Sequence, residues 1–188
     1  MIVAVVGDSI SAGSPLWDPD PAVRAAIAAT DERSRWQWWA AARDARLEFR
    51  TRAVYGKRTD EIERFVDDVA DGADVLVVQG GINDVVQQRR VEDAASSLAA
   101  MVERGRTLGL HVALADVLPW PRGDERAARD IVRLNELLHA VPGVTPLRFH
   151  DTLARLDREW SDDGDHPSVE GHRLLGDEAA RALSELEL

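Results

Sequence analysis

Short apolar runs alternate with amphipathic stretches along the whole chain, and this alternation is the strongest constraint on its fold. Residues 3–6 and 75–78 each form a run of four apolar residues, and each run is followed closely by glycine. Runs of this kind are typical of strands that are buried on both faces of a sheet. Residues 47–54, 111–117 and 144–149 are the other expected strands.

Helical periodicity fills the segments between these runs. The predicted helices cover residues 35–45, 60–70, 91–108, 125–140 and 169–186. A regular alternation of strand and helix predicts a parallel sheet with helices on both faces, joined by right-handed connections. A chain of 188 residues has the size of one ordinary domain, and we expect residues 1–188 to form it.

The least regular region covers residues 14–34, with three prolines near its start. It is expected to be a long loop that contains one short helix at residues 22–29. Long loops in compact domains are often functional, so one interpretation is a cover over a site. A surface excursion without a role is an equally good interpretation.

Charge and composition narrow the possible partners. The chain carries 34 acidic and 23 basic residues, a net charge of −11, which disfavours nucleic acid and anionic membranes. It has no cysteine, which excludes disulfides, thiolate metal ligands and thiol nucleophiles. Residues 1–8 lack a basic region and resemble a core strand more than a signal peptide. We therefore expect a cytoplasmic protein without a stable membrane association, whose oligomeric state the sequence does not indicate.

Four polar segments carry the chemistry that the sequence suggests. Residues 7–9 (Gly-Asp-Ser), 54–59 and 80–84 (Gly-Gly-Ile-Asn-Asp) each follow an expected strand. Residues 163–166 (Asp-Gly-Asp-His) lie just before the last predicted helix. Because ligands of open α/β sheets bind at the carboxyl ends of the strands, we expect the first three segments to share one edge of the sheet.

Serine, histidine and aspartate in these segments suggest nucleophilic catalysis. Asp163 and His166 are three residues apart, close enough within one turn for the carboxylate to reach the imidazole. If folding brings His166 to Ser9, the three side chains supply a nucleophile, a base and an orienting acid. Acyl transfer also needs hydrogen-bond donors for the oxyanion, and the Asn83 amide and the Ser9 N–H are candidates.

Each of these residues also has a structural interpretation. Ser9 and Asp8 can cap a helix, and we expect Asp8 to hold the turn. Asn83 and Asp84 can form a turn or cap the next helix, and Asp84 is expected to organise the loop.

The loop around His166 has two further alternatives. Asp165 competes with Asp163 as the orienting acid, although the side chain of an adjacent residue usually points away. The acids of this loop, together with His172, could also be read as metal ligands, but they lack a recognised ligand spacing. We expect neither a metal nor a cofactor.

Three tryptophans are candidates for the substrate pocket. Trp120 follows the fourth expected strand, and Trp160 lies three residues before Asp163. Both indoles could line an acyl or alcohol pocket. Trp17, in the long loop, is a candidate for a lid.

Taken together, the four segments resemble the SGNH hydrolase superfamily, the GDSL-type esterases and lipases. Residues 7–9 match the first block of that family, Gly56 matches the second, residues 81–84 match the third (Gly-x-Asn-Asp), and residues 163–166 match the fifth (Asp-x-x-His). The order and spacing fit across essentially the whole chain. The chain departs from the family at Thr51, where an Asn often stands five positions before the glycine of the second block.

The resemblance implies a flavodoxin-like α/β/α sandwich with a five-stranded parallel sheet. It implies Ser9 as nucleophile, His166 as base and Asp163 as its orienter, with an oxyanion hole made by Ser9, Gly56 and Asn83. The expected function is a serine esterase that hydrolyses short-chain acyl or acetyl esters of small molecules through an acyl-enzyme on Ser9. An acyltransferase with the same site and a catalytically silent binding domain of the same fold are the alternatives.

Overall fold

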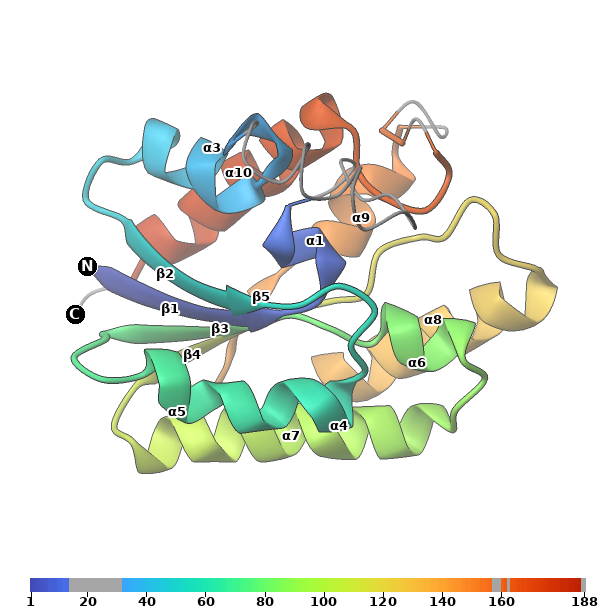
Figure 1. The fold of residues 1–188 in the computed structure, drawn as a ribbon, viewed down its shortest axis with the longest axis horizontal. Coiled ribbons are helices and arrows are strands. Elements are labelled where there is room, and N and C mark those ends of the chain that lie inside the picture. Colours follow the sequence, from blue (N-terminus) through green and yellow to red (C-terminus); the bar gives the residue numbers. More distant parts are fainter. Residues whose placement is uncertain (14–31, 157–159, 162, 187–188) are drawn as a thin grey trace, which may run out of the picture.

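A parallel sheet lies between two layers of helices (Figure 1). The computed structural model describes residues 1–13, 32–156, 160, 161 and 163–186. Within these residues the sheet has five strands in the order β2-β1-β3-β4-β5. They are β1 (Ile2–Gly7), β2 (Glu48–Ala53), β3 (Val75–Val78), β4 (His111–Ala115) and β5 (Thr145–Leu147). This strand order is that of the flavodoxin-like fold, and the predicted fold class is confirmed.

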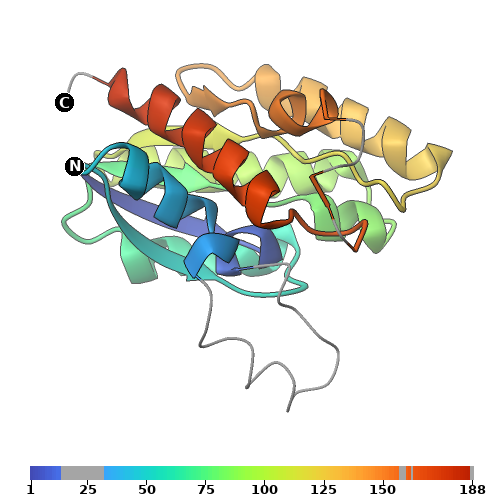
Figure 2. The same cartoon turned by 90° about the horizontal axis from the view of Figure 1, so that it is seen from above.

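Helices cover both faces of the sheet. On one face lie α1 (Ser9–Ala12), α3 (Trp36–Arg43), α9 (Phe149–Ala154) and α10 (Val169–Ser184), and Figure 2 shows α3 and α10 against each other. On the other face lie α4 (Thr59–Ile62), α5 (Val66–Val69), α7 (Val91–Thr107) and α8 (Glu125–His139). The short helix α6 (Ile82–Val86) follows β3.

The alternation of side chains along β1 divides the core in two. Val3 and Val5 pack with the helices α3, α9 and α10, whereas Ala4 and Val6 pack with α5, α7 and α8. All four side chains are fully buried, because successive residues of a strand point to opposite faces and both faces are covered. The apolar run at residues 3–6 is therefore explained by a central strand.

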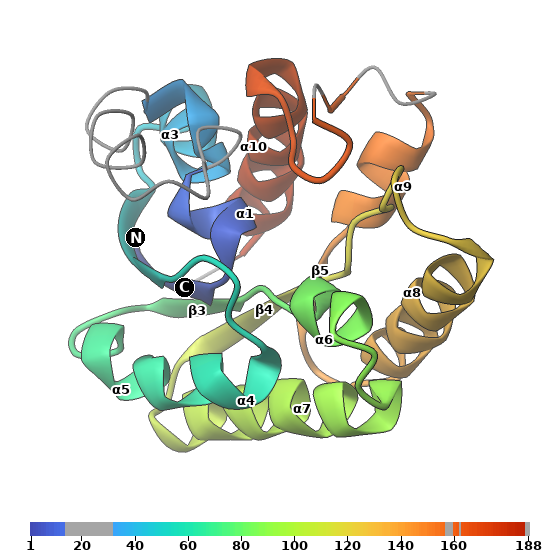
Figure 3. The same cartoon turned by 45° about the vertical axis from the view of Figure 1, so that its right-hand side comes forward.

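The strand order changes direction between β1 and β3. From β1 the chain goes outward to β2, and it then returns across β1 to build β3, β4 and β5 on the other side. Loops that leave β1 and β3 at their carboxyl ends diverge there, which opens a crevice at the switch point. Figure 3 looks toward this edge, where β1 leads into α1 and β3 into α6.

Most predicted elements are present, with small differences at their ends. The helix predicted at residues 60–70 is wound as α4, a 3₁₀ turn (Glu63–Phe65) and α5. Helices α6 and α9 were not predicted, because five or six residues are too few to show a helical period. The helix expected at residues 22–29 lies outside the described residues. None of the helices in the described ranges is long and apolar enough to cross a membrane.

Candidate active site

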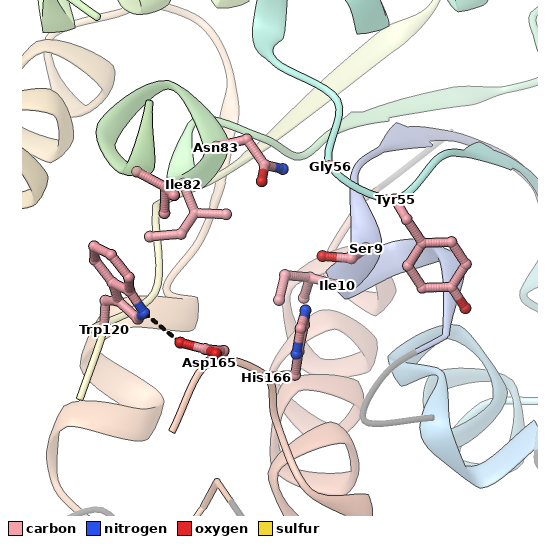
Figure 4. Close-up of a pocket in the computed structure, with 10 residues that line it drawn as sticks. Ser9, Ile10, Tyr55, Gly56, Ile82, Asn83, Trp120, Asp165 and His166 are labelled. Carbon is pink, nitrogen blue, oxygen red and sulfur yellow. Dashed lines mark hydrogen bonds between the residues drawn. The ribbon is translucent and has the colours of Figure 1, made fainter. Parts of the chain in front are cut away.

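The turn after β1 holds Ser9 at the start of α1. Asp8 caps this helix, since its Oδ1 accepts a hydrogen bond from the N–H of Ile10 at 2.9 Å. The Ser9 side chain points into a cavity (Figure 4) and accepts or donates no hydrogen bond within the described part of the chain. Its hydroxyl is therefore available for chemistry, while the expected structural role of Asp8 is confirmed.

A buried network of polar side chains holds this turn in place. Gln79, the residue after β3, accepts a hydrogen bond from Ser11 Oγ at 2.8 Å and donates one to Asp8 Oδ1 at 2.9 Å. Trp36 Nε1 donates to Ser11 Oγ at 3.0 Å. Burial raises the pKa of Asp8. Gln79 thus links the ends of β1 and β3.

Gly7 lets the network approach the backbone closely. A Cβ on Gly7 would lie 2.6 Å from Gln79 Oε1 and 2.8 Å from Ser11 Oγ, well inside van der Waals contact. Only a residue without a side chain fits between the strand and these groups. The glycine of the Gly-Asp-Ser segment is therefore required by packing.

Two further turns bring donors to the same cavity. Asn83 lies on α6, and one hydrogen of its amide is bound to the carbonyl of Lys57 at 3.0 Å. The second amide hydrogen has no acceptor among the described residues, and Asn83 lines the cavity. Gly56 lines the cavity with a backbone φ of 70°, and neither its N–H nor that of Ser9 has an acceptor in the described residues.

Asp84 organises the loop that carries Gly56. Its two carboxylate oxygens accept hydrogen bonds from the Thr59 N–H at 2.9 Å and the Thr59 hydroxyl at 3.1 Å. Asp84 thus ties the start of α4 to α6, as the sequence predicted.

The loop before α10 pairs Asp163 with His166. Asp163 Oδ2 lies 2.8 Å from His166 Nδ1, and Asp163 Oδ1 accepts from the His166 N–H at 2.7 Å. Burial alone would raise the pKa of Asp163, but the hydrogen bonds from His166 outweigh it and hold this pKa below its ordinary value. The carboxylate is thus ionised at neutral pH, with His166 Nδ1 fixed beside it.

Asp165 takes a different set of partners. Its Oδ1 accepts a hydrogen bond from Trp120 Nε1 at 2.7 Å, and its Oδ2 lies 2.9 Å from Arg122 Nη1. Between the two acids that competed for His166, the geometry favours Asp163.

One cavity of ≈ 220 Å³ joins these turns. Five of the predicted site residues line it, namely Ser9, Gly56, Asn83, His166 and Trp120. Asp163 is not among the lining residues, but its carboxylate contacts His166 Nδ1. No hydrogen bond joins Ser9 Oγ to His166 in the described residues, and such catalytic contacts are often long before substrate binds.

The three tryptophans are placed differently. Trp120 lines the cavity at the end opposite Tyr55 (Figure 4). Trp160 is 2 % exposed, belongs to the core beside α10 and does not line this cavity. Trp17 lies outside the described residues.

Four other cavity residues were not singled out from the sequence. They are Ile10, Tyr55, Ile82 and Val86. Three of them, Ile10, Tyr55 and Ile82, are direct neighbours of Ser9, Gly56 and Asn83, and this adjacency was the available signal. Asp165, which the sequence offered as an orienting acid, lines the cavity instead. In a tight turn, consecutive side chains can face the same space.

The described residues contain no group of three His, Asp or Glu side chains that could hold a metal ion. His172, the outermost member of the imagined ligand set, is buried within α10.

Comparisons with known proteins agree on the family and the fold. The sequence pattern of the GDSL-like lipase/acylhydrolase family matches residues 5–174. A search of curated proteins finds no significant match.

Solved structures of similar shape cover nearly the whole chain. A member of the lipolytic G-D-S-L family from Veillonella parvula is 17% identical, with a TM-score of 0.83 over 98% of this chain and 99% of its own. A putative lipolytic protein of the same family from Desulfitobacterium hafniense is 19% identical, with a TM-score of 0.79 over 96% and 98%. A mutant of Axe2, an acetyl-xylooligosaccharide esterase from Geobacillus, is 14% identical, with a TM-score of 0.75 over 99% and 94%. At these identities the likeness shows the fold.

Proposed function

The chain belongs to the GDSL-like lipase/acylhydrolase family, and on that premise we propose that residues 1–188 form one serine esterase domain that hydrolyses short-chain acyl esters, such as acetyl esters. Membership of this family supports ester hydrolysis as the general activity. The finer proposal rests on one observation, the convergence of Ser9, Gly56, Asn83 and His166 on a single cavity. The cavity volume of ≈ 220 Å³ supports a small acyl group.

The proposed reaction proceeds through an acyl-enzyme. His166 takes the proton from the Ser9 hydroxyl as Oγ bonds to the ester carbonyl carbon, and His166 then gives this proton to the departing alcohol as the carbon–oxygen bond breaks. A water molecule next loses a proton to His166 and attacks the acyl-enzyme. The acid leaves, and the proton returns to Ser9.

Two features of the site support this assignment of roles. The Asp163 carboxylate at 2.8 Å from His166 Nδ1 holds the ring with its other nitrogen free, and it stabilises the imidazolium that forms in each step. The N–H groups of Ser9 and Gly56 and the free amide hydrogen of Asn83 are donors for the oxyanion. They come from three different turns that line the same cavity.

Covalent labelling tests the proposed nucleophile directly. An alkyl fluorophosphonate is expected to add one phosphonyl group to the folded protein, and peptide mass spectrometry should place it on Ser9. The Ser9→Ala variant should stay unlabelled. Labelling of another residue, or none at all in folded protein, would contradict the proposal and favour a binding domain without catalysis.

The Asn83→Ala variant tests the oxyanion hole. Loss of one such donor typically lowers kcat by about 100- to 1000-fold, because the developing negative charge is no longer stabilised. The fold should persist, since the substitution removes one hydrogen bond, to Lys57, worth about 1 kcal/mol. The measurement is kcat on p-nitrophenyl acetate, with thermal unfolding in parallel.

Gln87→Ala is the matched control for Asn83→Ala. Gln87 also donates a side-chain hydrogen bond to this loop, at the Gly56 carbonyl, but it does not line the cavity. If both variants lose activity equally, bracing of the loop explains the loss and Asn83 is not an oxyanion donor.

A further inference from the structure

Trp120 borders two separate cavities. It lines the ≈ 220 Å³ cavity at Ser9, and it also lines a second hollow of ≈ 410 Å³ between α8 and α9. Trp120 is the residue that the two linings have in common among the residues described. Trp120 therefore lies at the boundary between the two cavities, and its side chain is the candidate partition.

Most of the residues that line the second hollow have apolar side chains. Apart from His150 its wall is made of glycine, proline, alanine, tryptophan and aliphatic residues, and Val132 on this wall is 53 % exposed. On the side of Ser9, Ile82 and Val86 add apolar side chains to the lining of the first cavity. Removal of the indole is therefore expected to join the cavity at Ser9 to the hollow beside α9.

Two neighbours restrain Trp120. Its Nε1 donates to Asp165 Oδ1 at 2.7 Å, and Arg122 Nη1 lies 2.9 Å from the other oxygen of this carboxylate. The ring also lies close to Gly123, where a Cβ would come within 2.7 Å of Trp120 Cε3. The N–H of Gly123 donates to the Trp120 carbonyl at 2.9 Å. Both the ring and its backbone are therefore held by contacts.

We propose that Trp120 determines acyl-chain length by closing the site against the apolar hollow, and that Asp165 is the positioning residue that holds it there. The proposal rests on the proposed esterase function and names its substrate class, esters of short acyl chains. Burial of the methylene groups of a long acyl chain in an apolar space is favourable. Trp120 would therefore limit the length of the acyl chain by keeping those groups out of the second hollow.

Hydrolysis of p-nitrophenyl esters from acetyl to dodecanoyl tests the wall. For the wild type, kcat/KM should fall beyond short chains. In Trp120→Ala, the ratio of kcat/KM for the decanoyl ester to that for the acetyl ester should rise at least about tenfold, since each further buried methylene is worth about fourfold. Trp38→Ala is the matched control, because Trp38 lies on α3 and borders neither cavity.

Trp120→Leu extends the test to a smaller change. Leucine keeps an apolar side chain and opens the partition only in part, so an intermediate ratio is expected. This variant also serves if Trp120→Ala does not fold. An unchanged decanoyl-to-acetyl ratio in a folded variant overturns the proposal. The proposal is also wrong if the substitution changes kcat/KM across a series of acetyl esters according to the size of their alcohol group.

Asp165 is tested by loss and by conservative rescue. Asp165→Ala should raise the same decanoyl-to-acetyl ratio, because the indole loses the one side-chain hydrogen bond that it makes within the described residues, while Trp120 itself is intact. Asp165→Asn keeps an oxygen acceptor for Trp120 Nε1 and should restore the wild-type ratio. A merely structural role for Asp165 would lower all rates together and leave the ratio unchanged, which would refute the positioning role.

The two proposals fail in different ways. If the folded wild type hydrolyses no ester and Ser9 takes no fluorophosphonate, the esterase function is wrong. If the wild type is active and labelled but Trp120→Ala keeps its chain-length ratio, the function stands and the partition is wrong.

Discussion

The Ser9→Ala variant is expected to hydrolyse p-nitrophenyl acetate about 10⁴- to 10⁶-fold more slowly than the wild type. The covalent route disappears with the hydroxyl, and only binding and oxyanion stabilisation remain to assist attack by water. The fold should be unaffected, because Ser9 Oγ has no hydrogen-bond partner among the described residues and the turn is held by Asp8 and Gln79. The measurement is kcat/KM together with the thermal unfolding midpoint.

Ser96→Ala controls for the chemical change itself. Ser96 lies exposed on α7 and does not line the cavity, and its loss should leave hydrolysis at the wild-type rate. Retention of more than about 1% of the activity by folded Ser9→Ala would show that Ser9 is not the nucleophile, given the size of effect expected for such a residue.

The Asp163→Asn variant should lose on the order of 10³- to 10⁴-fold in kcat, the range seen when the acid of such a triad is neutralised. Asp163 Oδ2 accepts from His166 Nδ1 at 2.8 Å in the wild type. An amide nitrogen at that position is a donor and favours the tautomer of His166 that carries its proton on the other nitrogen. That ring can no longer take a proton from Ser9.

Asp165→Asn is the comparison that makes this result specific. It removes the same charge from the same loop, but it keeps an acceptor for Trp120 and gives up only the exposed ion pair with Arg122. Its loss in kcat on the acetyl ester should be less than about tenfold. Equal losses in the two variants would mean that loop charge matters, and not the bond between Asp163 and His166.

The sequence identified most elements of the fold for a simple physical reason. Strands that are covered on both faces must be apolar throughout, so β1 and β3 are visible as uninterrupted runs, and β3 has the predicted bounds. The short helices α6 and α9 escaped notice because a single turn carries no period. The 3₁₀ turn inside the helix predicted at residues 60–70 was equally invisible, since its side chains are those of an ordinary helix.

The pairing of Asp163 with His166 could also be predicted from the sequence. The two residues are three apart, so a single turn decides their distance. The assembly of Ser9, Gly56 and Asn83 at one cavity followed from the rule that parallel strands end at the same edge. Both inferences need only local geometry or strand direction.

The positions of the tryptophan side chains could not be predicted from the sequence in this way. Trp120 and Trp160 were both candidates for the pocket, one after a strand and the other near the acid, yet Trp120 lines the cavity at Ser9 and Trp160 belongs to the core. The bond from Trp120 to Asp165 spans 45 residues, and that from Gln79 to Asp8 spans 71. The sequence alone determined the order of strands and helices and the identity of the polar turns, because each depends on neighbours along the chain. Only the tertiary structure decided which indole faces the cavity and what holds it, because such packing is set by side chains that the chain brings together from far apart.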